Sequence, residues 1–194
     1  QVMSLAEKQI IQRILNGKTE EYSYFLEQYS REVFAVVVRL LDNVQDAEEV
    51  TQDAFVSAYH HLADFRTEMS FATWVCRIAY NRAISVLRKR KQRLVQTDID
   101  ENQLANISDE TVSEFIDDAK SNQLAKLEKA LMLLPADDRV LLSLYYQEDK
   151  SLKEITYILG MDADSRRSVT TLATRIFRIR KKLYVLMRQN GGES

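Results

Sequence analysis

The sequence predicts an all-α protein in which two small helical domains are joined by an acidic linker. Helix-forming residues fill long runs, whereas the 194 residues include only 4 glycines and 1 proline, and this composition favours helices over strands. The net charge of -2 hides a marked segregation of charge. All charged residues are basic from 77 to 93, acidic from 94 to 119, and basic again from 165 to 192. Such blocks create local fields that the whole-chain sum does not report.

The first domain is expected to span residues 1–94 and to contain four helices. Ser4 and Glu7 have capping-box spacing, and Asn16-Gly17 is a typical end for the helix that they begin. A second helix is expected from about Thr19 to Leu41. Asn43 is then expected to cap a third helix, which carries apolar residues on one side and acidic ones on the other. With the helix that follows, these elements can close one core by residue 93.

The fourth helix, from Ser70 to Arg93, is the stretch around which this domain is organised. Ser70 is a candidate N-cap. One face of the helix is apolar, with Phe71, Trp74, Val75, Ile78 and Ala79 recurring at three- and four-residue spacing. A separate polar stripe contains Thr73, Arg77, Asn81, Ser85 and Arg88. The helix ends in the cations Arg88, Lys89, Arg90, Lys91 and Arg93. A polar stripe with a cationic end suits an extended polyanion such as DNA.

The second domain is expected at residues 119–194, after an acidic linker at 95–118. Pro135 should end one helix and open the next. Ser151 and Glu154 form another capping box, and Gly160 closes the short helix that they begin. After a polar turn, a basic helix extends to about Gln189. A short helix, a turn and a longer basic helix are typical of a helix-turn-helix.

The last helix combines an apolar stripe with cations that lie mostly off it. The stripe contains Val169, Leu172, Ile176, Ile179, Leu183 and Leu186. The cations are Arg166, Arg167, Arg175, Arg178, Arg180, Lys181 and Lys182. One side can pack on the domain while the other meets phosphates. The start of this helix is left open: it begins near Thr171 after an inserted turn, or it begins earlier, at Ser168-Val169-Thr170, and is longer.

Four segments, in this order, resemble the extracytoplasmic-function class of RNA polymerase sigma factors. DAEEVTQDAF at 46–55 is similar to the segment that grips the β′ clamp of the polymerase. The stretch FRTEMSFATWVCRIAYNRAISVLRKRK at 65–91 resembles the part that melts and reads the minus-ten element. Residues 127–160 resemble the start of sigma domain 4, and TRIFRIRKKL at 174–183 resembles the end of its recognition helix. The first domain would then be sigma domain 2.

The resemblance implies three sets of site residues. The set that binds core polymerase is Asp46, Glu49, Gln52, Asp53 and Phe55. The set that binds the minus-ten element is Phe65, Arg66, Ser70, Phe71, Arg77, Asn81, Arg88, Lys89, Arg90 and Lys91. The set that binds the minus-thirty-five element is Arg166, Arg167, Ser168, Thr171, Arg175 and Arg178.

The resemblance also implies the partners of the chain. These are promoter DNA, the RNA polymerase core through its β′ clamp and β flap, and an anti-sigma factor that covers the same surfaces. The acidic linker would tether the two domains and could also fold back on the basic faces.

Each candidate also has a purely structural interpretation. Trp74 is assigned to the core. Phe71 is also expected to pack in the core rather than to contact a base, whereas Phe65 fits a core role and a base contact equally well. The acidic side of the third helix would be an ordinary solvated face if seen alone. His60 and His61 lack further ligands for a metal. The sequence shows no catalytic arrangement, so no enzyme, metal or cofactor is expected.

The compartment is expected to be the cytosol. Cys76 is the sole cysteine, which excludes an intrachain disulfide. No apolar run reaches the roughly 20 residues that span a bilayer, and the first residues lack the pattern of a signal peptide.

Two alternative functions stay open at this point. A free-standing helix-turn-helix regulator would bind an operator as a dimer, but it leaves the 46–55 and 70–81 segments unexplained. A helical adaptor between proteins would carry solvated charge blocks and show little affinity for DNA. Charge reversal at Arg175, Arg178 and Arg180 separates the adaptor from both DNA-binding functions.

Overall fold

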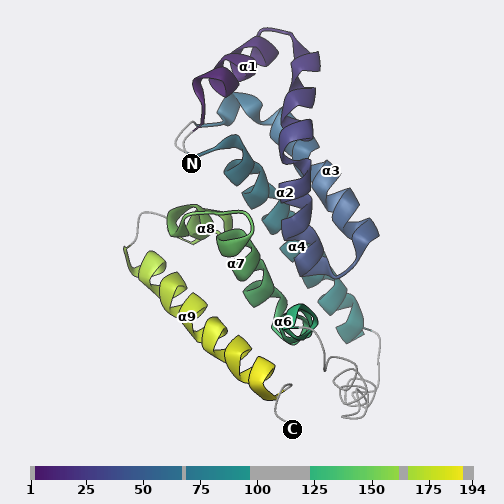
Figure 1. Ribbon diagram of the computed structural model, residues 1–194. Helices are drawn as coiled ribbons and strands as arrows, with labels where there is room; N and C mark the ends of the chain where they lie inside the picture. The colour runs from purple at the N-terminus through teal and green to yellow at the C-terminus, as the bar shows by residue number, and fades with distance from the viewer. Residues whose placement is uncertain (1–2, 67–68, 97–122, 162–165, 190–194) are drawn as a thin grey trace.

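The computed structural model describes residues 3–66, 69–96, 123–161 and 166–189. Within these ranges every regular element is a helix (Figure 1). Residues 3–96 are called the N-terminal part below, and residues 123–189 the C-terminal part. The predicted linker lies outside the described residues, except that Val95 and Gln96 continue a helix.

The N-terminal part contains four α-helices and two short 3-10 helices. In chain order they are α1 (Leu5–Leu15), η1 (Thr19–Tyr22), α2 (Ser23–Leu41), α3 (Val44–His60), η2 (Leu62–Asp64) and α4 (Phe71–Gln96).

Helix starts in this part follow the predicted caps. Ser4 and Glu7 form a complete capping box, and the side chain of Asn43 accepts the backbone N–H of Asp46. Ser70 Oγ accepts the backbone N–H of Thr73 at 3.2 Å. The expected helix from Thr19 differs at its start, because its first residues form the tighter η1 turn, which holds Tyr22 in the core.

The C-terminal part contains α6 (Gln123–Met132), α7 (Ala136–Tyr146), α8 (Leu152–Ile158) and α9 (Arg166–Gln189). Pro135 directly precedes α7 as predicted, and Ser151 with Glu154 completes the second capping box. Gly160 follows α8 with φ of 72°, a left-handed conformation that favours glycine. α9 already begins at Arg166, so the earlier and longer of the two starting points is the one observed.

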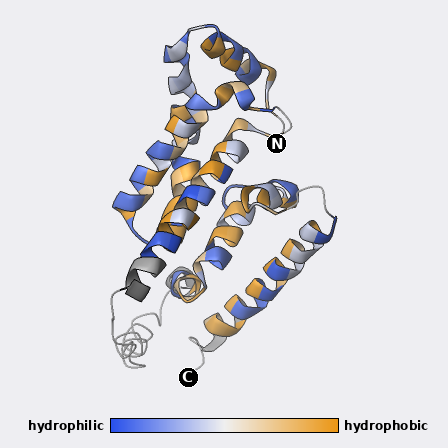
Figure 2. Cartoon of the chain, turned by 180° about the vertical axis from the view of Figure 1, so that it is seen from behind, coloured by the Kyte–Doolittle hydropathy of each residue, from blue (hydrophilic) through white to orange (hydrophobic). Residues whose placement is uncertain are grey.

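The two parts share one continuous hydrophobic core. In the N-terminal part its centre is Phe71, whose ring stacks on that of Phe25 with centroids 4.1 Å apart. α7 packs against α2, and α8 packs against α4, so the C-terminal part lies along one side of the N-terminal helices (Figure 1). α9 forms the outer layer on α6 and α8, and its residues alternate between polar and apolar along its length (Figure 2).

Candidate nucleic-acid and polymerase interface

The acidic side of α3 offers three exposed residues from the predicted polymerase-binding set, Glu49, Gln52 and Asp53. Asp53 accepts a hydrogen bond from Arg82 of α4 at 3.1 Å. Asp46 is half-buried and forms an ion pair with Arg90 near the end of α4. Part of the negative charge of this face is therefore neutralised by α4, and Glu49 is the clearest exposed acid of the set.

Three residues of the predicted contact sets lie in the interior of this structure. Phe55 is 3% exposed, and its carbonyl oxygen accepts a hydrogen bond from the hydroxyl of Tyr22 at 2.7 Å. Phe71 is fully buried, and Ser70 is buried as the cap of α4. The apolar periodicity that includes Phe55 and Phe71 is typical of residues that pack in a core. In this arrangement neither ring is exposed to a base or to a polymerase.

The loop before α4 places Phe65 and Arg66 at the edge of this core. Phe65 is half-buried, with its ring centroid 4.8 Å from that of Trp74 and 5.9 Å from that of Phe71. Arg66 is exposed. A half-exposed aromatic ring supported from behind, with a cation next to it, is chemically suited to stack on an unpaired base.

The polar stripe of α4 is partly covered by α8. Thr73 donates a hydrogen bond from its hydroxyl to Oε1 of Glu154 at 3.0 Å. The guanidinium carbon of Arg77 lies 4.4 Å from the ring centroid of Tyr157, a cation–π contact. Asn81, one turn further on, is exposed. The first half of the predicted minus-ten surface is therefore engaged within the chain, and the second half faces outward.

The cationic end of α4 divides between solvent and α3. Arg88 and Lys89 are exposed, whereas Arg90 is half-buried against Asp46. Lys91 belongs to the helix, but its side chain lies outside the described part. Arg88 and Lys89 can therefore contact phosphates without breaking an ion pair within the chain.

α9 separates its packing face from its polar face as predicted. Leu172, Ile176 and Ile179 are buried. Arg166, Arg167, Thr171 and Arg178 of the minus-thirty-five set are exposed, and Ser168 is half-buried. Arg175 forms an ion pair with Asp138 of α7 at 2.6 Å. Arg175 thus anchors α9, while the other arginines of the set point their charge outward.

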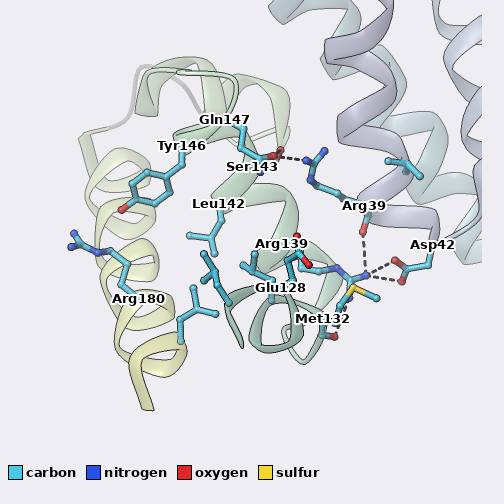
Figure 3. A pocket seen from close by; sticks show the side chains of 14 residues that line it. Arg39, Asp42, Glu128, Met132, Arg139, Leu142, Ser143, Tyr146, Gln147 and Arg180 are labelled. Carbon is cyan, nitrogen blue, oxygen red and sulfur yellow. Dashed lines mark hydrogen bonds and ion pairs between the residues drawn. The ribbon is translucent and has the colours of Figure 1, made fainter. Parts of the chain in front are cut away.

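Contacts between α2 and the C-terminal part were missed by the sequence analysis. Arg139 of α7 donates to both carboxylate oxygens of Asp42, at 2.6 and 2.7 Å, and Arg39 bonds to Gln147 (Figure 3). Asp42 holds φ of 50° at the end of α2, a left-handed conformation that Asp tolerates better than most residues. These pairs join residues about a hundred positions apart, and no local pattern could have indicated them.

Lys150 and Glu32 form a second missed contact, and this one is buried. Nζ of Lys150 lies 2.7 Å from Oε1 of Glu32, with side chains 5% and 19% exposed. Burial alone lowers the pKa of Lys150, but its hydrogen bond with Glu32 and the neighbouring negative charge raise it above its ordinary value. Burial, and then the charge of Glu32, raises the pKa of the Cys76 thiol, and the same two causes raise the pKa of Glu148.

A cavity of about 820 Å³ lies between α2, α6, α7 and α9 (Figure 3). Its apolar lining includes Leu127, Leu131 and Leu142. The cations of the lining are Arg39, Arg139 and Arg180. In the described ranges, no group of three or more His, Cys, Asp or Glu side chains is placed to hold a metal ion. No helix among the described residues is both long enough and apolar enough to cross a membrane.

Known proteins resemble the chain over nearly its whole length. The model of sigma-70 region 2 matches residues 25–93. The RNA polymerase sigma-H factor of Pseudomonas aeruginosa is 27% identical over 182 residues, covering 91% of each chain. The extracytoplasmic-function sigma factor SigW of Bacillus subtilis is 27% identical over 186 residues, covering 93% of this chain and 96% of its own.

Two solved structures share the fold. The sigma factor RpoE of Bartonella quintana, in complex with the anti-sigma factor NepR, aligns with a TM-score of 0.64 at 21% identity, over 87% of this chain and 98% of its own. CnrH, in complex with the cytosolic domain of CnrY, aligns with a TM-score of 0.61 at 20% identity, over 93% of this chain and 96% of its own.

The chain thus combines a segment that matches sigma-70 region 2 with a C-terminal part whose last two described helices are the short α8 and the longer, basic α9. The chain is similar to RNA polymerase sigma factors, one of them of the extracytoplasmic-function class, over more than 90% of its length.

Proposed function

We propose that this chain is a transcription initiation factor that binds core RNA polymerase and directs it to specific promoters. The observation that carries the proposal is the match of residues 25–93 to sigma-70 region 2, together with relatives named as sigma factors over more than 90% of the chain. Neither a free-standing operator-binding regulator nor an adaptor accounts for that match. The factor acts by binding rather than by covalent chemistry, and it works in the cytoplasm beside the polymerase.

Domain 2, residues 1–94, docks on the β′ clamp through the exposed acidic side of α3. Glu49 and Gln52 are the strongest candidates, because both are exposed and neither belongs to the ion pairs that join α3 to α4. Charge complementarity with a basic partner surface would steer and orient docking. The same domain opens DNA at the minus-ten element with Phe65, Arg66, Asn81 and the exposed cations Arg88 and Lys89.

Domain 4, residues 119–194, reads duplex DNA at the minus-thirty-five element and rests on the β flap. The exposed side of α9, with Arg166, Arg167, Thr171 and Arg178, supports insertion into a major groove. Ser168 and Arg175 lie at the border of this face and the domain. The acidic segment at 95–118 tethers the two domains. An anti-sigma factor is the expected regulator, because the structural neighbour RpoE was solved in complex with one.

Co-purification with bacterial core RNA polymerase tests this function. The unaltered chain is expected to bind, and the Glu49→Lys/Gln52→Ala variant to lose at least tenfold in affinity. Glu27→Lys, an equal charge reversal at an exposed position of α2, is the matched control and should bind normally. A chain that fails to bind core polymerase, or a double variant that binds as well as the control, contradicts the proposal.

A further inference from the structure

Two ion pairs join the acidic side of α3 to α4, which packs beside it (Figure 1). Arg90 of α4 pairs with Asp46 of α3. One turn of helix pairs higher up, Nη1 of Arg82 lies 3.1 Å from Oδ2 of Asp53. Both acids belong to the set expected to bind core polymerase, and both arginines lie on the helix expected to bind the minus-ten element. The two surfaces therefore share charges, although separate segments of the sequence indicated them.

Neither of these ion pairs is buried. The side chains of Arg90 and Asp46 are 43% and 28% exposed, and those of Arg82 and Asp53 are 41% and 58% exposed. Pairs with this exposure contribute little to stability, because water screens the charges and two long side chains lose freedom when they pair. A charge that is brought by a partner can therefore replace one member of either pair at small cost.

Arg82 belongs to none of the predicted sets, but it lies where a nucleic acid that follows the outer side of α4 would pass. It directly follows the exposed Asn81. Ser85 and Lys89, which are also exposed, lie one and two turns further along the side of the helix that carries Arg82. The guanidinium of Arg82 is turned toward Asp53. Released from that carboxylate, this long side chain can turn toward a phosphate instead.

We propose that Arg82 and Arg90 exchange partners when the chain binds polymerase and promoter. In the free chain they neutralise two acids of α3. In the complex those acids pair with cations of the polymerase, and the two arginines pair with DNA phosphates. The inference rests on the proposed function, from which it takes both surfaces, and it adds Arg82 to the residues that bind DNA. Because the two partners compete with the same internal pairs, each strengthens the binding of the other by the same factor.

Affinity for core polymerase, measured without DNA, is the first test. Arg82→Gln and Arg90→Gln should each bind core about threefold more tightly than the unaltered chain, since the acid of each pair loses an internal competitor whose strength is that of an exposed ion pair. In the Asp46→Asn background, Arg90→Gln should have no effect. Arg31→Gln removes an equal charge at an exposed position of α2, outside the ion pairs of the described residues, and should leave the affinity for core unchanged.

The second readout is the affinity of the full chain, without polymerase and at low salt, for a fluorescein-labelled pool of single-stranded 20-mers of random sequence. Asp46→Asn and Asp53→Asn should each add about 0.7 to the slope of log affinity against log salt, which is the contribution of one further phosphate contact on a single strand. Asp46→Asn should lose this effect in the Arg90→Gln background. Glu48→Gln is the matched control, because it removes an exposed acid of α3 outside the two pairs, and it should leave the slope unchanged.

The inference is overturned if Arg82→Gln and Arg90→Gln, both folded by circular dichroism, bind core no more tightly than Arg31→Gln does. It is equally overturned if Asp46→Asn changes the salt slope no more than Glu48→Gln does, or by the same amount with and without Arg90→Gln. Either result in a chain that binds core refutes partner exchange alone. Failure of the unaltered chain and of every variant to bind core refutes the proposed function.

Discussion

At the scale of single residues, Phe71 shows how one side chain can satisfy two interpretations of a sequence. Its position resembles that of a DNA-reading residue, yet its ring stacks on Phe25 and meets the edges of Tyr22 and Trp74 with centroids 6.2 and 5.8 Å away. Aromatic pairs of this geometry add to the stabilisation from area burial. The ring therefore supports the half-buried Phe65 from behind.

Phe71→Ala should lower the free energy of unfolding by about 3–5 kcal/mol, because it opens a large cavity in a fully buried aromatic cluster. Chemical denaturation followed by circular dichroism measures this loss. Phe177→Ala is the matched control, since Phe177 is 56% exposed on α9 and its loss should cost about 0.5 kcal/mol or less. Equal effects of the two substitutions would contradict the packing role.

At the scale of elements, short sequence patterns predicted those helix ends and helix faces that depend on neighbouring residues. Both capping boxes, the Asn43 and Ser70 caps, the stop at Pro135 and the buried stripe of α9 were predicted and confirmed. Each depends on residues within about four positions of one another. The start of α9 was ambiguous, because its first turn contains two arginines and a serine but no apolar residue to mark a period.

The two faces of α9 should respond differently to charge reversal. Arg178→Glu should leave the free energy of unfolding within about 0.5 kcal/mol, because Arg178 is exposed. Arg175→Glu should destabilise the fold by about 1 kcal/mol or more, because it places a carboxylate beside Asp138 of α7. Thermal denaturation measures both effects.

Both substitutions of α9 should also weaken promoter binding by the polymerase complex. Arg178→Glu should in addition reduce the salt dependence of that binding, since one phosphate contact is lost. If Arg178→Glu destabilised the isolated chain as much as Arg175→Glu does, the assignment of the two faces would be wrong.

At the scale of the whole molecule, the sequence did not indicate how the two parts meet. Glu32, Asp42, Arg139 and Lys150 are ordinary charged residues in their own helices and turns, and their partners lie about a hundred positions away. Only the folded chain brings them together. The same limit applies to Phe55, whose burial depends on how α3 lies against its neighbours.

The contacts between the parts should differ in their response to salt. Asp42 is 60% exposed in its pair with Arg139, whereas the Lys150–Glu32 pair is buried. Raising salt from about 0.1 M to about 1 M shortens the Debye length from about 10 Å to about 3 Å and screens mainly exposed pairs. Fluorescence energy transfer between dyes on cysteines introduced at the exposed positions Val56 of α3 and Val185 of α9 should therefore fall only slightly. Arg139→Ala should lower the transfer efficiency at 0.1 M and have little further effect at 1 M. Complete loss of energy transfer at 1 M would contradict a buried, salt-resistant contact between the two parts.

The order of α4 and α8 in the chain has a consequence for synthesis on the ribosome. Helix α4 is complete at Gln96, whereas α8, which packs against it, ends at Ile158. At about 5–20 residues per second, the ribosome needs roughly 3–12 s to add the intervening residues. During that interval the ribosome has made α4 but has not yet completed the helix that contacts Thr73 and Arg77. Every molecule therefore passes once through a stage at which these contacts cannot form.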